Sequence, residues 1–462
     1  MKRLLISGTN SGCGKTTITC AVLKALSGRG LRVSAFKCGP DYIDPMFHKR
    51  VIGVDSHNLD SFFCDDNTLC FLLNEYSAEI SIIEGVMGYY DGVNGRGSAH
   101  SVSLITNTPS VLVVNCRGMS DSLGAVVSGF LNYRENNIKG VIFNGLPERL
   151  EDLARSVCCE LGMEYLGRFP KCGFSLDSRH LGLVTPAEMT DIREKLSRLG
   201  ELAERHLDID KLVEISESGE LSFNVPELPR SILPASRTKA RSLTRYSRNI
   251  SGDSPPVIAV SEDNAFCFRY AENLDLLRKL GCRIKKFSPL EDSAVPECDG
   301  LILCGGYPEL YAKQLFSNAD MLRSVRKTIG SGVPTIAECG GFMYLHERFT
   351  DNSGAEYTGV GIIKGRVRKT DKLQRFGYVE LTSERGNLLC REGEKIRAHE
   401  FHYWDSDNAG SDLIAKKADG REWECAHCTE NLYAGFPHLY FYSDIGIAER
   451  FVQKAAEFRG KL

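Results

Sequence analysis

The chain has 462 residues, of which 42% are hydrophobic and 25% are charged, and this balance excludes a disordered protein. The length exceeds what one ordinary hydrophobic core organises, so we expect two domains. A formal net charge of -3 gives no overall attraction to nucleic acid or to an anionic membrane, so the expected partners are small molecules.

Two features of the sequence bear on where the protein works. Residues 1–8 contain two cations followed by only three apolar residues, too short a run for a signal peptide or a membrane helix. The 17 cysteines lie scattered through apolar runs, where reduced thiols behave as small hydrophobic side chains. We therefore expect a cytoplasmic protein with reduced cysteines.

Short apolar runs alternate with helical patterns from the first residues onward. The predicted strands are residues 4–7, 33–37, 80–84, 111–115 and 141–144, and an amphipathic helix is predicted over 16–26. Wholly apolar strands separated by amphipathic helices are typical of a parallel sheet that is covered on both faces. The predicted fold class of this half is therefore α/β with a parallel sheet.

A glycine-rich segment, ISGTNSGCGKTT at residues 6–17, joins the first predicted strand to the first predicted helix. Such a P-loop wraps backbone N–H groups around the phosphates of ATP, while its lysine reaches the β/γ-phosphates and its hydroxyl binds Mg²⁺. The ATP-binding candidates are Gly12, Gly14, Lys15, Thr16 and Thr17. Thr9 stands where the strict pattern has its first glycine, and Gly8 precedes it by one residue. A purely structural turn is the alternative, which the strand and helix on either side disfavour.

Acidic residues follow two further predicted strands, in KCGPDYIDP at 37–45 and IIEGVMGYYDG at 82–92. Ligands gather at the carboxyl ends of parallel strands, and Mg²⁺ held by ATP needs only one or two protein carboxylates. We expect Thr16, Asp41 and Glu84 to hold the metal, although either carboxylate alone could simply cap a turn. Tyr42, Asp44 and Asp91 are then the residues expected to face the substrate that accepts the phosphoryl group.

The middle of the chain changes in composition. Residues 186–215 are helical in pattern and charged, and residues 226–256 are rich in proline, serine and arginine. The second stretch cannot bury enough apolar surface to offset its ordering entropy, so it is interpreted as a solvated linker, although its cations could dock an anion. The predicted domains are residues 1–195 and 256–462, joined by a closing helix and linker over 196–255.

A second alternation of strands and helices follows the linker. Predicted strands cover 257–260, 283–287, 300–304 and 334–337, and predicted helices cover 271–280, 310–329 and 446–458. Cys339 comes directly after one of these strands and before a helical run, in a turn that exposes a nucleophile to the field of a helix N-terminus. Gly306 also ends a strand, and its backbone N–H together with that of Gly340 is predicted to form an oxyanion hole.

A cysteine nucleophile needs a general base, and four histidines lie downstream: His399, His402, His427 and His438. His438 is the preferred candidate because it ends a polar loop just before the final helix, but spacing alone leaves His402 open. Cys425 and Cys428 have the spacing of metal ligands. No second pair at a suitable distance completes a zinc site, so none is predicted.

These motifs together resemble the cobyrinate a,c-diamide synthase family over almost the whole chain. The matching segments are residues 8–17, 36–45, 84–88 with 91–92, 179–183, 265–268 with 272–275, 305–309 and 337–341. The resemblance implies a synthetase domain similar to dethiobiotin synthetase, followed by a class I glutaminase α/β domain. It also supports His438 as the base, although Tyr440 stands where many class I glutaminases carry a glutamate.

The family's chemistry gives the two motifs one purpose. ATP would activate a corrinoid carboxylate as an acyl phosphate, and Cys339 with His438 would release ammonia from L-glutamine to form the amide. The resemblance thus implies ATP as co-substrate, Mg²⁺ as cofactor and a cobalt corrinoid as substrate, and leaves a homodimer open. A closed route for ammonia is our hypothesis.

Three alternatives follow from the same motifs. Nickel-sirohydrochlorin or metal-free hydrogenobyrinate could replace cobyrinate, since the enzymes that amidate them share nearly all these segments. Cobyric acid synthase is disfavoured because it usually carries Gln-Asn-Met where this chain has Gly39, Pro40 and Asp41. A P-loop ATPase switch with an inactive glutaminase-like binding domain is disfavoured by the intact Cys339.

Overall fold

The computed structural model describes residues 1–172, 186–226 and 255–460. The RHLGL motif at 179–183 and nearly all of the predicted linker lie outside these ranges. The chain divides into two compact units, Met1–Pro226 and Glu227–Leu462, each described here by itself. Among the described residues, no helix is long and apolar enough to cross a membrane.

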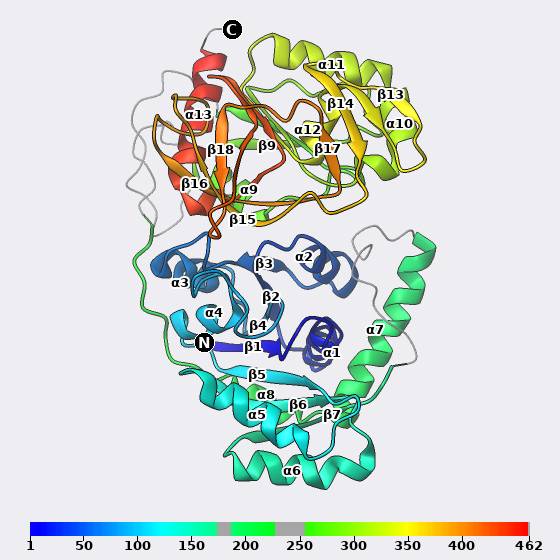
Figure 1. Ribbon diagram of the computed structural model, residues 1–462, viewed down its shortest axis with the longest axis vertical. Helices are drawn as coiled ribbons and strands as arrows, with labels where there is room; N and C mark the ends of the chain where they lie inside the picture. The colour runs from blue at the N-terminus through cyan, green and yellow to red at the C-terminus, as the bar shows by residue number, and fades with distance from the viewer. Residues whose placement is uncertain (173–185, 227–254, 461–462) are drawn as a thin grey trace. The chain divides into compact units, whose positions relative to one another are not determined.

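The first unit is built on a seven-stranded sheet in the order β3-β2-β4-β1-β5-β6-β7, and every pair in it is parallel (Figure 1). Its strands are β1 (Lys2–Gly8), β2 (Val33–Cys38), β3 (Ser56–Leu59), β4 (Ile80–Glu84), β5 (Ser110–Asn115), β6 (Ile138–Asn144) and β7 (Glu164–Phe169). The central strands are almost wholly buried, as their apolar sequences predict.

Helices cover both faces of this sheet. They are α1 (Lys15–Gly28), α2 (Ile43–Phe47), α3 (Asp66–Glu75), α4 (Ala99–Ile105), α5 (Ser122–Tyr133), α6 (Glu151–Glu160), α7 (Pro186–His206) and α8 (Ile209–Ile215). Side chains of α1, α7 and α8 form one core with the strands, while α3, α4 and α5 lie on the opposite side (Figure 1). Helix α7 packs along α1 and runs through position 195, where the first predicted domain ended, so it belongs to the first unit.

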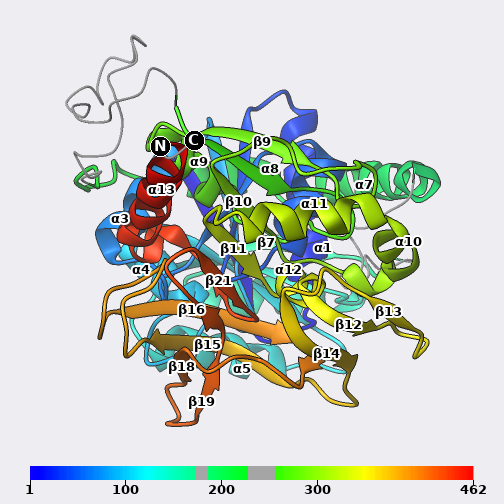
Figure 2. The same cartoon turned by 90° about the horizontal axis from the view of Figure 1, so that it is seen from above.

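The second unit contains a six-stranded sheet in the order β20-β21-β11-β10-β8-β9 (Figure 2). Its strands are β8 (Val257–Ser261), β9 (Arg283–Phe287), β10 (Gly300–Leu303), β11 (Thr335–Glu338), β20 (His427–Cys428) and β21 (Leu432–Gly435). All pairs are parallel except β20 with β21. The helices are α9 (Ala271–Lys279), α10 (Ala312–Ser317), α11 (Ala319–Gly330), α12 (Gly340–Tyr344) and α13 (Ile445–Arg459). The α/β class predicted for both halves is confirmed.

Two further sheets of this unit were not predicted. One is β12 (His346–Thr350), β13 (Glu356–Thr358), β14 (Ile363–Lys369) and β17 (Trp404–Ser406). The other is β15 (Arg375–Thr382), β16 (Lys395–His402), β18 (Leu413–Lys416), β19 (Glu422–Cys425) and β22 (His438–Leu439). Buried and exposed residues are mixed along β14 and β16, so these strands lack the apolar runs by which the strands of the two larger sheets were recognised.

The single helix predicted over 310–329 is wrong. A short 3₁₀ turn at Pro308–Leu310 is followed by two helices, α10 and α11, which break at Asn318. The Asn318 side chain accepts a hydrogen bond from the Met321 N–H and caps α11. A capping asparagine therefore starts a new helix inside a continuous apolar pattern.

Candidate active sites

The P-loop joins β1 to α1, and its shape depends on two glycines. A Cβ at Gly14, which has φ 98°, would lie 2.1 Å from Asn144 Nδ2, and that amide donates a 2.8 Å hydrogen bond to the Cys13 carbonyl. A Cβ at Gly8 would lie 2.1 Å from Cys13 Sγ. Only glycine fits at either position. This explains why a glycine stands at Gly8, one residue before the first glycine of the strict motif.

The loop's lysine and hydroxyls lie at the start of α1. Lys15 is buried, and its ammonium donates a 2.9 Å hydrogen bond to the Asn10 carbonyl. Burial lowers the pKa of Lys15. Thr16 and Thr17 are half-buried in the first turn of the helix, and Gly12 is exposed with φ 76°. This is the arrangement that the P-loop motif predicts.

A buried group of charged side chains adjoins Thr16. The Thr16 hydroxyl donates to Glu84 Oε1 over 2.6 Å, and the Lys37 ammonium donates to the same oxygen over 2.8 Å. Lys37 also pairs with Asp44 Oδ2 at 2.5 Å and lies 3.9 Å from Asp41 Oδ2. These residues follow or end β2 and β4, which are neighbours in the sheet, and β4 in turn lies beside β1. Strand order therefore brings the three predicted segments together.

Charge in this group is set by burial and by Lys37. Burial, with repulsion from Asp44, raises the pKa of Glu84 to about 7, against the opposing effect of Lys37. Burial lowers the pKa of His48 to about 4, so that imidazole is neutral. His48 Nε2 lies 3.7 Å from Glu84 Oε2, and neither atom has a hydrogen-bond partner in the described part of the chain. Oε1 of Glu84 thus accepts two hydrogen bonds, whereas Oε2 accepts none from the described residues.

Sequence reasoning missed Lys37. It lies in a buried strand whose other residues, apart from Ser34, are apolar. A lysine is almost never buried without a partner, so its position indicated a buried acidic partner. Asp41, by contrast, has the turn-capping role that the sequence left open for it. Its Oδ1 caps the turn by accepting from the N–H groups of Ile43 and Asp44, while its side chain stays 31% exposed.

The predicted substrate residues do not form one surface. Asp44 is only 4% exposed and is bound to Lys37, so it lies inside the charged group. Tyr42, two residues before Asp44, is also buried and lies at the start of α2. Asp91 is exposed, and its Oδ2 accepts from the Gly88 N–H at 2.7 Å in the loop after β4. Of the three, Asp91 is the one that solvent reaches freely.

The thiol site is formed by three neighbouring strands of the six-stranded sheet, β21, β11 and β10. Cys339 follows β11 with φ 46°, a left-handed conformation that is strained for a residue with a side chain. It is 5% exposed, and α12 begins directly after it. A strained cysteine between a strand and a helix is the nucleophile turn that the sequence predicts.

His438 lies against this cysteine. The imidazole is 2% exposed and hydrogen-bonds the Cys339 side chain, and its Nδ1 lies 3.4 Å from Glu338 Oε2. Burial alone would lower the pKa of His438, but the Cys339 sulfur and the Glu338 carboxylate raise it to about 10. The histidine is therefore an imidazolium at neutral pH, with the Cys339 sulfur beside it.

The other histidines have different partners. His402 Nδ1 lies 2.6 Å from the Trp404 carbonyl and Nε2 lies 3.2 Å from Glu400 Oε2, so both ring nitrogens are engaged. His427 Nε2 lies 3.1 Å from the Asn408 carbonyl. Of the four downstream histidines, His438 is the one whose contact with Cys339 is established. Within the described ranges, no three histidine, cysteine or acidic side chains form a group that could hold a metal, and this includes the surroundings of Cys425 and Cys428.

The two backbone amides predicted for an oxyanion hole lie close together. A Cβ on Gly340 would be 3.0 Å from the Gly306 nitrogen. Neither amide donates a hydrogen bond to another group in the described part of the chain. Both N–H groups are therefore available to an oxygen bound beside Cys339.

We expect Gly305→Ala to damage the thiol site. A Cβ at Gly305 would lie 2.5 Å from His438 Cε1, so the added methyl displaces the imidazole from Cys339. Glutamate release should fall ~10²-fold, as expected for a displacement of about 1 Å at a catalytic group. Gly330→Ala is the control, since a Cβ there meets nothing within 4 Å. Equal glutamate release by both variants would contradict the expectation.

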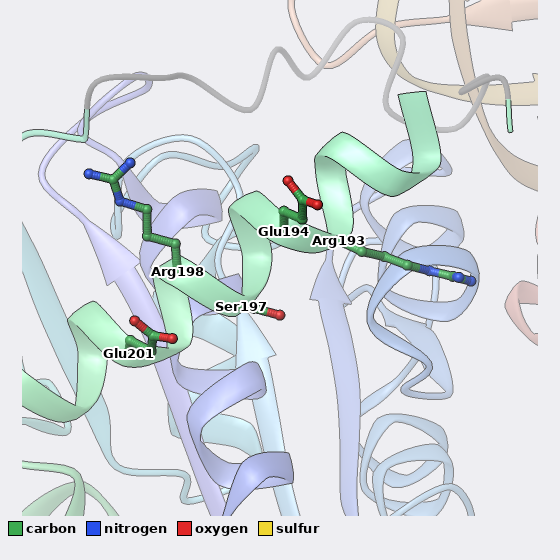
Figure 3. A pocket seen from close by; sticks show the side chains of 5 residues that line it. All are labelled: Arg193, Glu194, Ser197, Arg198 and Glu201. Carbon is green, nitrogen blue, oxygen red and sulfur yellow. The ribbon is translucent and has the colours of Figure 1, made fainter. Parts of the chain in front are cut away.

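A separate hollow lies along α7. It is lined by Arg193, Glu194, Ser197, Arg198 and Glu201, none of which was predicted in either site (Figure 3). Figure 3 shows Arg193 and Arg198 pointing away from each other, so the two cations do not converge on one ligand. We assign no function to it.

Comparison with known proteins places both units in described families. Residues 4–173 match the CobQ/CobB/MinD/ParA nucleotide-binding domain, and residues 257–445 match the CobB/CobQ-like glutamine amidotransferase domain. A cobyrinate a,c-diamide synthase of Thermoplasma volcanium is 38% identical, over 99% of this chain and 98% of its own length. Synthases of the same name from Listeria innocua and Priestia megaterium are 37% and 36% identical over 97% and 98% of the chain. The chain therefore belongs to the cobyrinate a,c-diamide synthase family.

Proposed function

We propose that the protein uses ATP and L-glutamine to amidate the a and c carboxylates of cobyrinate, giving cobyrinate a,c-diamide. The names of its full-length relatives and the pairing of a nucleotide-binding domain with a glutamine amidotransferase domain support this ligase reaction. The single observation that carries it is the contact between His438 and the strained Cys339. A domain retained only for binding has no need of a strained nucleophile.

The first half of the reaction is carboxylate activation. Hydroxide is too poor a leaving group for ammonia to displace, so the γ-phosphoryl group of ATP is transferred to a substrate carboxylate oxygen, giving an acyl phosphate and ADP. Lys15 and the N–H groups of the P-loop hold the β/γ-phosphates and stabilise the charge that develops on them. Asp91, exposed in the loop after β4, is the group we propose to orient the acceptor.

The residues beside the P-loop fit a magnesium ion. Thr16 and Glu84 place hard oxygen atoms 2.6 Å apart, and Glu84 has a second oxygen without a hydrogen-bond donor in the described chain. With Asp41 they would hold Mg²⁺, whose remaining ligands come from ATP and water. The bound ion would supply positive charge to the β/γ-phosphates. Lys37, which is itself paired with Asp44, holds Glu84 in place.

The second half supplies ammonia. The Cys339 thiolate attacks the side-chain carbonyl carbon of glutamine, and the resulting oxyanion is held by the N–H groups of Gly306 and Gly340. His438 gives its proton to the departing amide nitrogen, and water then hydrolyses the thioester to glutamate. Ammonia attacks the acyl phosphate, which forms the amide and releases phosphate. In this proposal ATP and Mg²⁺ bind to the first unit, and glutamine binds to the second.

The substrate is tested with a panel of tetrapyrroles. We expect the protein, given ATP, Mg²⁺ and glutamine, to convert cobyrinate into a diamide that mass spectrometry resolves. Nickel-sirohydrochlorin and hydrogenobyrinate, run in parallel, are expected to react more slowly. Reaction of nickel-sirohydrochlorin alone would overturn the named substrate and leave the chemistry intact.

A further inference from the structure

The histidine of the thiol site needs a group that holds its ring. Two residues after His438 stands Tyr440, an aromatic residue buried in edge contact with Tyr270 at 4.8 Å, so that position supplies no carboxylate. The backbone there is fixed instead by Asn273, whose side chain donates to the Leu439 carbonyl and accepts from the Phe441 N–H, each over 2.8 Å. Asn273 fixes the backbone on either side of Tyr440, but the imidazole of His438 still needs a hydrogen-bond acceptor to hold its ring.

Glu338, the residue directly before the nucleophile, has the required position. Its Oε2 lies 3.4 Å from His438 Nδ1, and its Oε1 accepts a 3.3 Å hydrogen bond from the Leu439 N–H. The Glu338 side chain is 11% exposed and therefore largely screened from water. One oxygen holds the strand that carries the histidine, and the other faces the ring.

We propose that Glu338 is the positioning residue of the glutaminase site, which holds His438 as the Nδ1–H tautomer and stabilises its imidazolium form beside the Cys339 thiolate. The inference rests on the proposed glutaminase function. With Nδ1–H directed at Glu338, the other ring nitrogen, Nε2, is left to exchange protons at the reaction centre.

Each step then has a place for its proton. The sulfur–carbon bond forms as Cys339 attacks, and the imidazolium proton passes from Nε2 to the amide nitrogen as the carbon–nitrogen bond breaks and ammonia leaves. The neutral imidazole next takes a proton from the water that attacks the thioester. The carbon–sulfur bond breaks, glutamate leaves, and the thiolate–imidazolium pair is restored. Glu338 keeps its charge throughout and stabilises the imidazolium at both ends of the cycle.

The surroundings of His438 agree with this role. The titratable groups that face it are Cys339, Glu338 and His399, its partner across β16 and β22. Burial lowers the pKa of His399 to about 3, so that ring is neutral and leaves Glu338 as the charged carboxylate beside His438. The Cys339 sulfur and then the Glu338 carboxylate raise the pKa of His438 above its ordinary value of 6.5 to about 10, so the stability contributed by its imidazolium form is complete below about pH 6.5 and disappears as pH rises through 10.

The test is Glu338→Gln in the full-length protein. Glutamine keeps the size of the side chain and can still accept from the Leu439 N–H, but its amide favours the opposite tautomer of His438. We expect kcat for glutamate release to fall ~10²-fold or more while KM changes by less than ~3-fold. The alkaline limb of the pH–kcat profile should move to lower pH, because the Glu338 carboxylate is one of the groups that raise the pKa of His438. Amidation with added ammonium should be unaffected.

Two further variants keep the result interpretable. Glu338→Asp retains the carboxylate on a shorter side chain, and we expect it to restore part of the lost kcat and part of the shift in the pH–kcat profile. Glu347→Gln removes an exposed carboxylate from β12 and is expected to match the wild type. A wild-type kcat and pH–kcat profile in Glu338→Gln, or a loss that Glu338→Asp does not restore, would overturn the proposal. A wild-type protein that releases no glutamate would overturn the proposed function itself.

Discussion

Cys339→Ser is expected to abolish glutamine-driven amidation while leaving ammonium-driven amidation at the wild-type rate. Serine fits the strained position after β11 with almost no change in volume, so the fold is retained. Its hydroxyl is a far weaker nucleophile than the thiolate that the His438 imidazolium stabilises, so glutamate release should fall ~10³-fold or more. Amide formation with added ammonium chloride needs only the first unit and bypasses the cysteine.

The measurement compares product formation with glutamine and with ammonium under the same ATP concentration. Cys159→Ser is the matched control, because that thiol is exposed on α6 and belongs to no proposed site. Loss of both activities in Cys339→Ser, with Cys159→Ser normal, would contradict a separate ammonia-releasing step. Retention of glutamine-driven activity would show that another residue is the nucleophile.

Lys15→Met is expected to remove amidation whichever nitrogen source is supplied. The buried lysine begins α1 and is the group proposed to hold the β/γ-phosphates, and its loss should slow amide formation by ~10²–10³-fold. Methionine fills the same volume without the charge, so the buried position stays packed. Basal glutamate release should continue, since Cys339 and His438 belong to the second unit.

The matched control for Lys15→Met is the substitution of a lysine outside the proposed sites. Lys139→Ala removes an exposed lysine on β6 and is expected to match the wild type in ADP release and in amidation. ADP release and amidation are measured with ammonium as the nitrogen source. Wild-type amidation by Lys15→Met would mean that the phosphates bind elsewhere.

The parts of the sites that sequence predicted are those encoded in contiguous motifs. Lys15, Thr16, Cys339, Gly306 and Gly340 each lie in a loop or helix start that follows a strand, and strand order brings these segments together. Asp41 and Glu84 followed from the rule that ligands collect at the carboxyl ends of parallel strands.

The parts that sequence did not predict depend on contacts through space. Lys37 meets Glu84 and Asp44 only because β2 and β4 are neighbours in the folded sheet, and Glu338 meets His438 across 100 positions of sequence. The four-stranded and five-stranded sheets were missed because buried and exposed residues are mixed along strands such as β14 and β16, which dilutes the apolar signal. Local patterns identify elements, but pairing between distant elements decides which charges are buried together.

The central claim is that one chain moves nitrogen from glutamine to a corrinoid carboxylate at the expense of ATP. It is tested most directly with glutamine labelled with ¹⁵N in its side-chain amide, incubated with cobyrinate, ATP and Mg²⁺ and followed by mass spectrometry. We predict a diamide carrying ¹⁵N in both new amide groups, formed only when ATP is present. Glutamate and ADP released without any labelled corrinoid amide would contradict the account.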